Sequence, residues 1–87
     1  MPTYKIPTEL LLQAVGDETV ILDPRSGNYF TLDSIGTDMI QQFRENDSVE
    51  ATAQNMSEKH DVSQATIHAD LVGLLNEMAD QGLVQKT

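Results

Sequence analysis

The spacing of hydrophobic and polar residues changes near residue 33 and divides the chain into two halves. In the first half, short runs of alternating or β-branched residues are separated by turn sequences, which is typical of strands. Gly16-Asp17 suits a tight turn with positive φ, and Asp23-Pro24-Arg25-Ser26-Gly27 combines a proline that presets φ with a glycine for a left-handed position. The pattern predicts two hairpins in series, a three-stranded antiparallel β-meander with strands near residues 10–15, 19–22 and 28–32.

In the second half, the apolar residues follow the spacing of amphipathic helices. The residues that can cap these helices are Asp33 or Ser34, Ser48 or Asp47, and Ser63. The three apolar stripes are Ile35, Met39, Ile40 and Phe43; Val49, Ala53 and Met56; and Ile67, Leu71, Leu74, Leu75 and Met78. Gly82 stands where a helix C-cap belongs, and Leu83 and Val84 are expected to fold back onto the core. The pattern therefore predicts one small α+β domain over residues 1–87, with three α-helices after the meander.

Length and composition limit the kind of protein. The chain has 87 residues and no cysteine, which excludes disulfide scaffolds, thiolate metal sites and thiol nucleophiles. A chain of this length buries only about 60–65% of the surface of its unfolded form, which leaves no room for a full core and a deep catalytic pocket together. The longest apolar run, Leu10-Leu11-Leu12, is far shorter than a membrane span, and the N-terminus lacks the apolar stretch of a signal peptide. We expect a cytoplasmic, water-soluble module.

Charge narrows the choice of partners, because five Lys and Arg stand against fourteen Asp and Glu, a net charge of −9 at pH 7. The basic residues, which are scattered singly, are Lys5, Arg25, Arg44, Lys59 and Lys86. Nucleic-acid sites cluster such residues to displace counterions from phosphates, and anionic membrane surfaces attract the same positive charge. We therefore expect no nucleic acid and no membrane as a partner. The charge suits a protein or peptide that carries basic residues.

No group of residues predicts catalysis or metal binding. His60 and His68 are eight residues apart, whereas a metal-binding helix pair has i, i+4 spacing with a carboxylate close by. We expect His60 to be an exposed loop residue. The serines fall at expected turns or helix caps, and the glycines are too dispersed for a phosphate-binding loop. The sequence therefore predicts no enzyme, no catalytic residues, no metal site and no cofactor.

Two features leave room for a binding surface. The third predicted helix carries an apolar arc broader than the ~100° that a core-facing helix needs, because Val72, Leu75 and Ala79 widen its stripe. The third strand is at an edge of the meander and lacks the Lys, Pro or bulge that usually guards an edge. Together they could accept an extended peptide as an added strand. The alternatives are a helix buried all round, and an edge covered by a loop with Tyr29 and Phe30 completing the core.

The run from Thr19 to Asp33 is similar to the "vvLLD…tGryyrLN" segment of the PqqD-like family. The other matching positions are Ile35-Gly36, Ile40, Val49, Asp61-Val62, Asp70-Leu71, Leu74-Leu75, Met78 and Gly82-Leu83-Val84. The resemblance covers roughly residues 10–85. One departure is Asp33, where the family commonly has Asn, and both residues can cap a helix.

Members of this family are small winged-helix-like modules known as RiPP recognition elements, used in making ribosomally synthesised, modified peptides such as lasso peptides and pyrroloquinoline quinone. The resemblance implies a non-catalytic module that captures a precursor leader peptide and presents it to a tailoring enzyme, a leader peptidase or a radical SAM enzyme. The leader is expected to add beside the third strand and to pack on the third helix. The implied peptide-binding residues are Asn28, Tyr29, Phe30, Thr31 and Leu32 on the strand, and Ile67, His68, Leu71, Val72 and Leu75 on the helix.

Which of these residues face the groove is left open. Strand alternation places Asn28, Phe30 and Leu32 on one face, and Tyr29 and Thr31 on the other. Two other functions also stay open. A winged-helix nucleic-acid-binding protein would share the fold class, but the predicted third helix has no Arg or Lys to reach phosphates or guanine edges. The other is a regulatory subunit that docks on an enzyme without a peptide groove.

Overall fold

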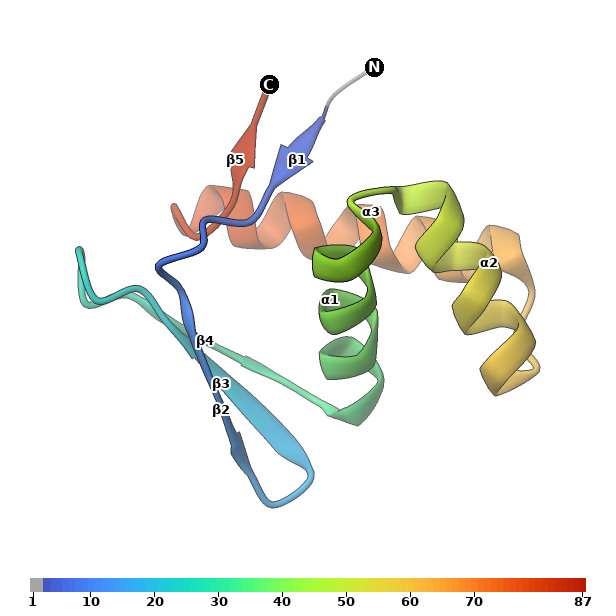
Figure 1. Ribbon diagram of the computed structural model, residues 1–87, viewed down its shortest axis with the longest axis horizontal. Coiled ribbons are helices and arrows are strands. Elements are labelled where there is room, and N and C mark those ends of the chain that lie inside the picture. The colour runs from blue at the N-terminus through green and yellow to red at the C-terminus, as the bar shows by residue number, and fades with distance from the viewer. Residues whose placement is uncertain (1–2) are drawn as a thin grey trace.

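The computed structural model describes residues 3–87, which form three helices and two small sheets (Figure 1). The elements in chain order are β1 (Tyr4–Lys5), β2 (Leu11–Val15), β3 (Glu18–Leu22), β4 (Tyr29–Leu32), α1 (Ser34–Asn46), α2 (Val49–His60), α3 (Gln64–Asp80) and β5 (Gln85–Lys86). The predicted α+β fold, a three-stranded antiparallel meander followed by three helices, is confirmed.

The meander has the strand order β2-β3-β4, with both pairs antiparallel. Gly16 (φ +65) begins the short turn between β2 and β3, and Gly27 (φ +80) lies in the longer turn between β3 and β4. Both angles are in the left-handed region, which glycine enters at little cost because it has no Cβ. The helix α1 packs against β3 and β4, so it covers one face of the sheet.

Side-chain caps start all three helices, as the sequence predicts. The Asp33 side chain accepts a hydrogen bond from the backbone N–H of Gly36, and Ser48 and Ser63 cap α2 and α3 in the same way. These bonds satisfy backbone donors that the first turn leaves free. At the other end of α3, the C-cap is Gln81 rather than Gly82, which follows it with φ +77. The chain then turns back, and the predicted burial of Leu83 and Val84 is confirmed.

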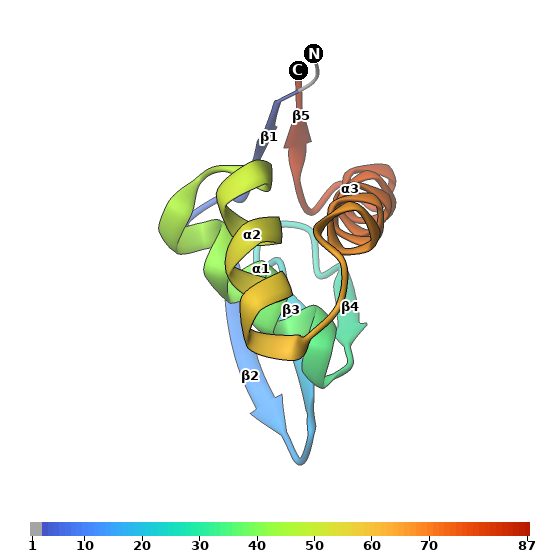
Figure 2. The ribbon, with the colours of Figure 1, turned by 90° about the vertical axis from the view of Figure 1, so that its right-hand side faces the viewer.

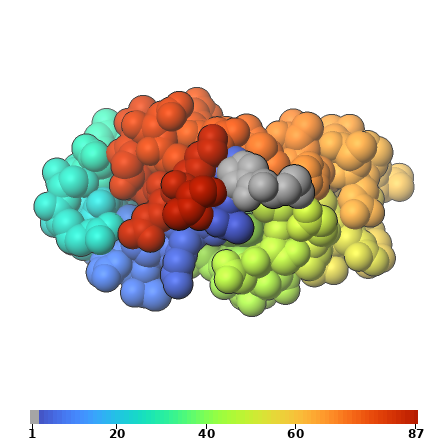
Figure 3. All heavy atoms as spheres, turned by 90° about the horizontal axis from the view of Figure 1, so that it is seen from above, coloured from blue at the N-terminus to red at the C-terminus, as the bar shows by residue number. Residues whose placement is uncertain are grey.

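A second sheet, which no pattern in the sequence predicts, joins the two ends of the described chain. The strands β1 and β5 pair antiparallel, and Thr3 and Thr87 exchange two backbone hydrogen bonds of 2.9 Å. In the space-filling view, the C-terminal residues lie beside the N-terminal strand (Figure 3). The Tyr4 hydroxyl also donates to Asn76 Oδ1 over 2.7 Å, which ties β1 to α3.

The core lies between the sheet and the helices, and it corrects two expectations. The buried face of α1 runs through Gly36, Met39, Ile40 and Phe43. Ile35 is displaced from this face by about 100° of helix rotation, and it is 47% exposed rather than buried. His60 is not an exposed loop residue: it is the last residue of α2 and half-buried, with its Nε2 2.9 Å from Asp38 Oδ2.

Candidate functional site

The strand β4 forms an edge of the three-stranded sheet. Within residues 3–87, it pairs only with β3. The backbone N–H of Asp23 donates to the carbonyl of Asn28 over 2.9 Å, and hydrogen bonding in an antiparallel pair alternates along the strand. Phe30 and Leu32 therefore direct their backbone groups to β3. Tyr29 and Thr31 direct their N–H and C=O groups outward, along the open edge.

A cavity of about 450 Å³ lies beside this edge. It is lined by Gly27, Asn28, Tyr29, Phe30, Thr31 and Gln81. Its far wall is the end of α3, because the Asn28 side-chain amide donates to the Gln81 carbonyl over 3.1 Å. In Figure 2, β4 and α3 lie on the same side of the molecule. We call this cavity and the adjoining outward-facing groups of β4 the edge groove.

The turn that leads into β4 is held by a charged pair. Asp23 Oδ1 accepts hydrogen bonds from the backbone N–H of Arg25 over 2.9 Å and from its Nε over 3.1 Å. The side-chain hydrogen bond from Arg25, more than any other influence, lowers the pKa of Asp23, and the same bond raises the pKa of Arg25. The ionised pair therefore fixes the start of the strand that borders the edge groove.

The four residues of β4 in the predicted site alternate between the two faces of the sheet. Tyr29 is 69% exposed and Thr31 is also exposed, whereas Phe30 is half-buried against the core and Leu32 is buried. This burial follows the alternation of a strand. Phe30 and Leu32 therefore point toward the core side, while Tyr29 and Thr31 point to the opposite face.

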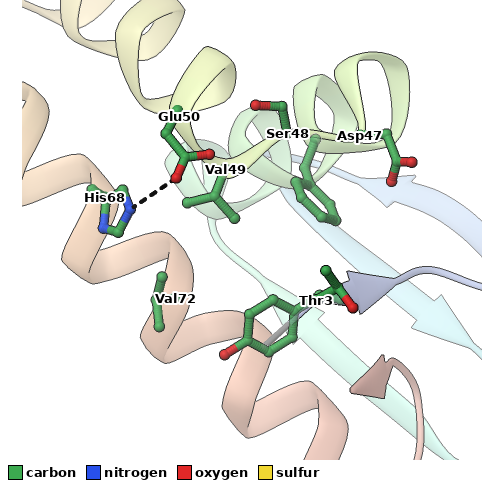
Figure 4. A pocket seen from close by; sticks show the side chains of 9 residues that line it. Thr3, Asp47, Ser48, Val49, Glu50, His68 and Val72 are labelled. Carbon is green, nitrogen blue, oxygen red and sulfur yellow. Dashed lines mark ion pairs between the residues drawn. The ribbon is translucent and has the colours of Figure 1, made fainter. Parts of the chain in front are cut away.

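None of the five predicted helix residues lines the edge groove. Ile67, Leu71 and Leu75 belong to the hydrophobic core and have almost no exposed surface. His68 and Val72 line a different cavity, next to Val49 and Glu50 at the start of α2 (Figure 4). The structure thus brings the strand residues together along one edge and places the helix residues beneath or beyond it.

Two residues that line the edge groove, Gly27 and the α3 C-cap Gln81, are missing from the predicted site. Gln81 lines the edge groove directly, and Leu74 lies seven residues before it, close to two helical turns, so both lie along the same side of the helix. Leu74 is half-buried and packs against the core. Leu74 belongs to the predicted apolar stripe of the helix, but tertiary packing decides which flank of the helix faces β4.

The described residues offer no cluster of three or more His, Asp or Glu side chains that could hold a metal ion. Within the same residues, no helix has the length and apolar character to span a bilayer.

The family model for coenzyme PQQ synthesis protein D (PqqD) matches residues 18–84. The chain belongs to the PqqD family. The matched residues include β3, β4 and all three helices, and therefore both walls of the edge groove. No curated protein sequence matches the chain.

Two solved structures have the same fold with a TM-score of 0.81 each. One is TbiB1 in complex with the TbiA(beta) leader peptide, which is 26% identical and aligns over 93% of this chain and 94% of its own. The other is a lasso peptide synthetase B1 complexed with the leader peptide, which is 21% identical and aligns over 94% of this chain and 96% of its own. The family resemblance noted from the sequence is confirmed.

Proposed function

We propose that this protein is a non-catalytic module that captures the leader of a ribosomally made precursor peptide by adding it as a strand to β4. The open edge of β4, with a cavity of about 450 Å³ beside it, is the observation that carries the proposal. The likeness to TbiB1, whose structure contains a leader peptide, supports it. An extended leader bound here would lie between β4 and α3.

Strand addition explains how such a module could serve a disordered ligand. Tyr29 and Thr31 each offer an outward N–H and C=O, so backbone hydrogen bonds would supply affinity with little dependence on sequence. Apolar surface from Phe30 and Leu74 would then select the side chains that anchor the leader. Because a disordered peptide loses conformational entropy on docking, we expect moderate affinity.

The ten peptide-binding residues implied by the family resemblance have three different roles in this proposal. Asn28, Tyr29, Phe30 and Thr31 line the edge groove and would contact the leader there. The buried residues Leu32, Ile67, Leu71 and Leu75 support the groove from the core. His68 and Val72 lie outside the groove, in the second cavity.

The receiving partner in this proposal is a cytoplasmic tailoring enzyme, either a leader peptidase or a radical SAM enzyme. The net charge of −9 favours encounter with basic segments of leader or enzyme. A winged-helix nucleic-acid-binding protein is not favoured, because α3 carries five acidic or amide side chains and no Lys or Arg on its sequence from Gln64 to Asp80.

The direct test compares Thr31→Pro with Thr31→Val by fluorescence anisotropy, using the labelled leader of a precursor encoded beside this chain. Proline removes one outward N–H of β4, which an edge strand tolerates, whereas valine keeps that donor. We expect Thr31→Pro to weaken binding about tenfold and Thr31→Val to leave it nearly unchanged. A scrambled leader controls for charge and composition.

The other edge of the sheet provides a matched control. Successive residues of β3 direct their backbone hydrogen bonds alternately to β4 and to β2. As a result, the backbone N–H of Ala14 in β2 points away from β3. Ala14→Pro therefore makes the same chemical change at the β2 edge. Equal binding by folded Thr31→Pro and Thr31→Val proteins, or a loss confined to Ala14→Pro, would exclude strand addition at β4.

A further inference from the structure

A second cavity, of about 460 Å³, lies against the flank of α3 that carries His68 and Val72 (Figure 4). Its volume is within the range of about 300–1,000 Å³ that is usual for ligand pockets. Elements distant in the sequence form it: β1 contributes Tyr4, α1 contributes Phe43, and the start of α2 contributes Val49 and Glu50. We call it the flank pocket.

The apolar part of the flank pocket is held in place by the fold. Tyr4 is buried, and its hydroxyl donates to Asn76 of α3 over 2.7 Å, which fixes the position of the ring. Phe43 is part of the core, and Val49 and Val72 are half-buried. These side chains form a largely pre-organised apolar surface, which can accept a side chain without a large cost of ordering.

The flank pocket also carries negative charge. Glu50 and Asp47 line it, and no Lys or Arg does so among the described residues. Its other polar lining residues include Thr3, Ser48 and His68. Glu50 Oε1 is 4.0 Å from His68 Nε2, and the Glu50 side chain remains 66% exposed. Carboxylates beside an apolar surface favour a positively charged group next to an apolar one in the ligand.

We propose that the flank pocket docks a protein partner through an apolar side chain flanked by lysine or arginine. This inference rests on the proposed function, in which the partner is the enzyme that receives the captured peptide. Because His68 and Val72 lie on a different flank of α3 from Gln81, the flank pocket and the edge groove are separate surfaces. Leader and enzyme can therefore bind the module at the same time.

Short peptides with blocked ends test the chemistry of the flank pocket. The ¹⁵N-labelled protein is titrated to millimolar concentration with Arg-Leu-Arg, with Arg-Gly-Arg, which keeps the charge, and with Glu-Leu-Glu, which keeps the apolar side chain. We expect saturable amide shifts at Val49, Glu50, His68 and Val72 with Arg-Leu-Arg alone. Absence of these shifts, or equal shifts with either control peptide, would overturn the proposal.

Two charge-reversal variants on α2 show whether peptide binding depends on the location of the acidic residue or only on the net charge of the protein. Glu50→Lys changes the flank pocket, whereas Glu58→Lys makes the same change at an exposed position of the same helix outside it. We expect Glu50→Lys to raise the dissociation constant for Arg-Leu-Arg about threefold to tenfold, and Glu58→Lys to leave it within twofold. An equal effect of both variants would show attraction by net charge and would overturn the proposal.

A lysine in the first turn of α2 also weakens the helix. Val72→Gln therefore provides a second variant of the flank pocket. Its control is Ala69→Gln, at an exposed position of α3. Leader binding, measured separately by anisotropy, is expected to stay within twofold in all four variants. If the unaltered protein does not bind the leader, this result disproves only the proposed function. Sedimentation at the same concentrations distinguishes a further outcome: self-association abolished by Val72→Gln would identify a second copy as the occupant and overturn the proposal.

Discussion

The side-chain amide of Asn28 donates to the main-chain carbonyl of Gln81 over 3.1 Å and connects the start of β4 to the end of α3. These two residues are 53 positions apart in the chain and close one end of the edge groove. The carbonyl belongs to the last turn of a helix, where backbone acceptors lack helical donors. One exposed hydrogen bond therefore connects the two walls between which the leader is proposed to bind.

Replacing Asn28 by Ala is expected to weaken leader binding about threefold, because the wall formed by α3 loses its tie to β4. The free energy of unfolding should fall by no more than about 1 kcal/mol, since both groups can bond to water instead. Anisotropy and urea unfolding measure the two effects. Asn55→Ala, at an exposed position of α2, serves as the control, and leader affinity equal to that control would contradict the prediction.

The two flanks of α3 are expected to respond differently to the same substitution. Leu74→Gln should reduce leader affinity about tenfold, because Leu74 lies on the side of the helix that carries Gln81. Val72→Gln should leave leader affinity within twofold, since Val72 lines the flank pocket. Anisotropy on both folded variants is the measurement. A larger loss for Val72→Gln would mean that the leader lies along the flank that carries His68.

Leu71→Ala is expected to act on stability rather than on recognition. Leu71 is fully buried, so truncation leaves a cavity and lowers the free energy of unfolding by about 2–5 kcal/mol. For a small domain this is a large share of the total stability. Urea unfolding measures the loss, and Leu11→Ala, at a position 56% exposed, should change stability by less than about 0.5 kcal/mol. Once corrected for the folded fraction, leader affinity should match that of the unaltered protein.

Asp38 forms hydrogen bonds with Gln42, Lys59 and His60, and this cluster predicts a dependence of stability on pH. Burial acts to raise the pKa of Asp38, but hydrogen bonds from Lys59, His60 and Gln42 together outweigh it, and the pKa is lowered. A carboxyl with a lowered pKa stabilises the fold fully above its unfolded value of about 4 and loses this contribution as pH falls through the folded value. Asp38→Asn should therefore lower the free energy of unfolding by about 1 kcal/mol near pH 7, and the difference should shrink below about pH 4.

Urea unfolding over a pH series measures this difference directly. Asp17→Asn makes the same change of charge in the exposed β2–β3 turn and is the control. The free energies of unfolding of Asp38→Asn and of the unaltered protein are compared at each pH. A difference that stays constant down to about pH 2 would contradict a stabilising role of the ionised Asp38 carboxylate.

The elements that could be predicted from the sequence are those fixed by local chemistry. The turns at Gly16 and Gly27 and the caps Asp33, Ser48 and Ser63 each depend on residues within a few positions of one another. By contrast, β1 and β5 have two residues each and pair across nearly the whole chain, so no periodic pattern marks them. His60 was misplaced for a similar reason, because its partner Asp38 is 22 residues away on α1.

The strand side of the candidate site could be predicted because an edge strand without guarding residues is visible in the sequence, and β4 is at an edge of the sheet. The helix side could not be predicted, because the residues of the broad apolar arc of α3 face three different surfaces. Leu71 and Leu75 enter the core, Val72 lines the flank pocket, and Leu74 lies along the side of Gln81. Which flank meets β4 is decided by the contacts of α3 with Tyr4 and α2, which periodicity cannot reveal.

The pairing of β1 with β5 also determines where another polypeptide could be joined to this one. Thr3 and Thr87 are hydrogen-bonded to each other, so polypeptides joined at these two residues would emerge from the same spot on the surface. That spot is remote from the β2–β3 turn, as the ribbon shows (Figure 1). A fluorescent protein or an affinity handle could thus be joined at either of these two residues with equivalent geometry.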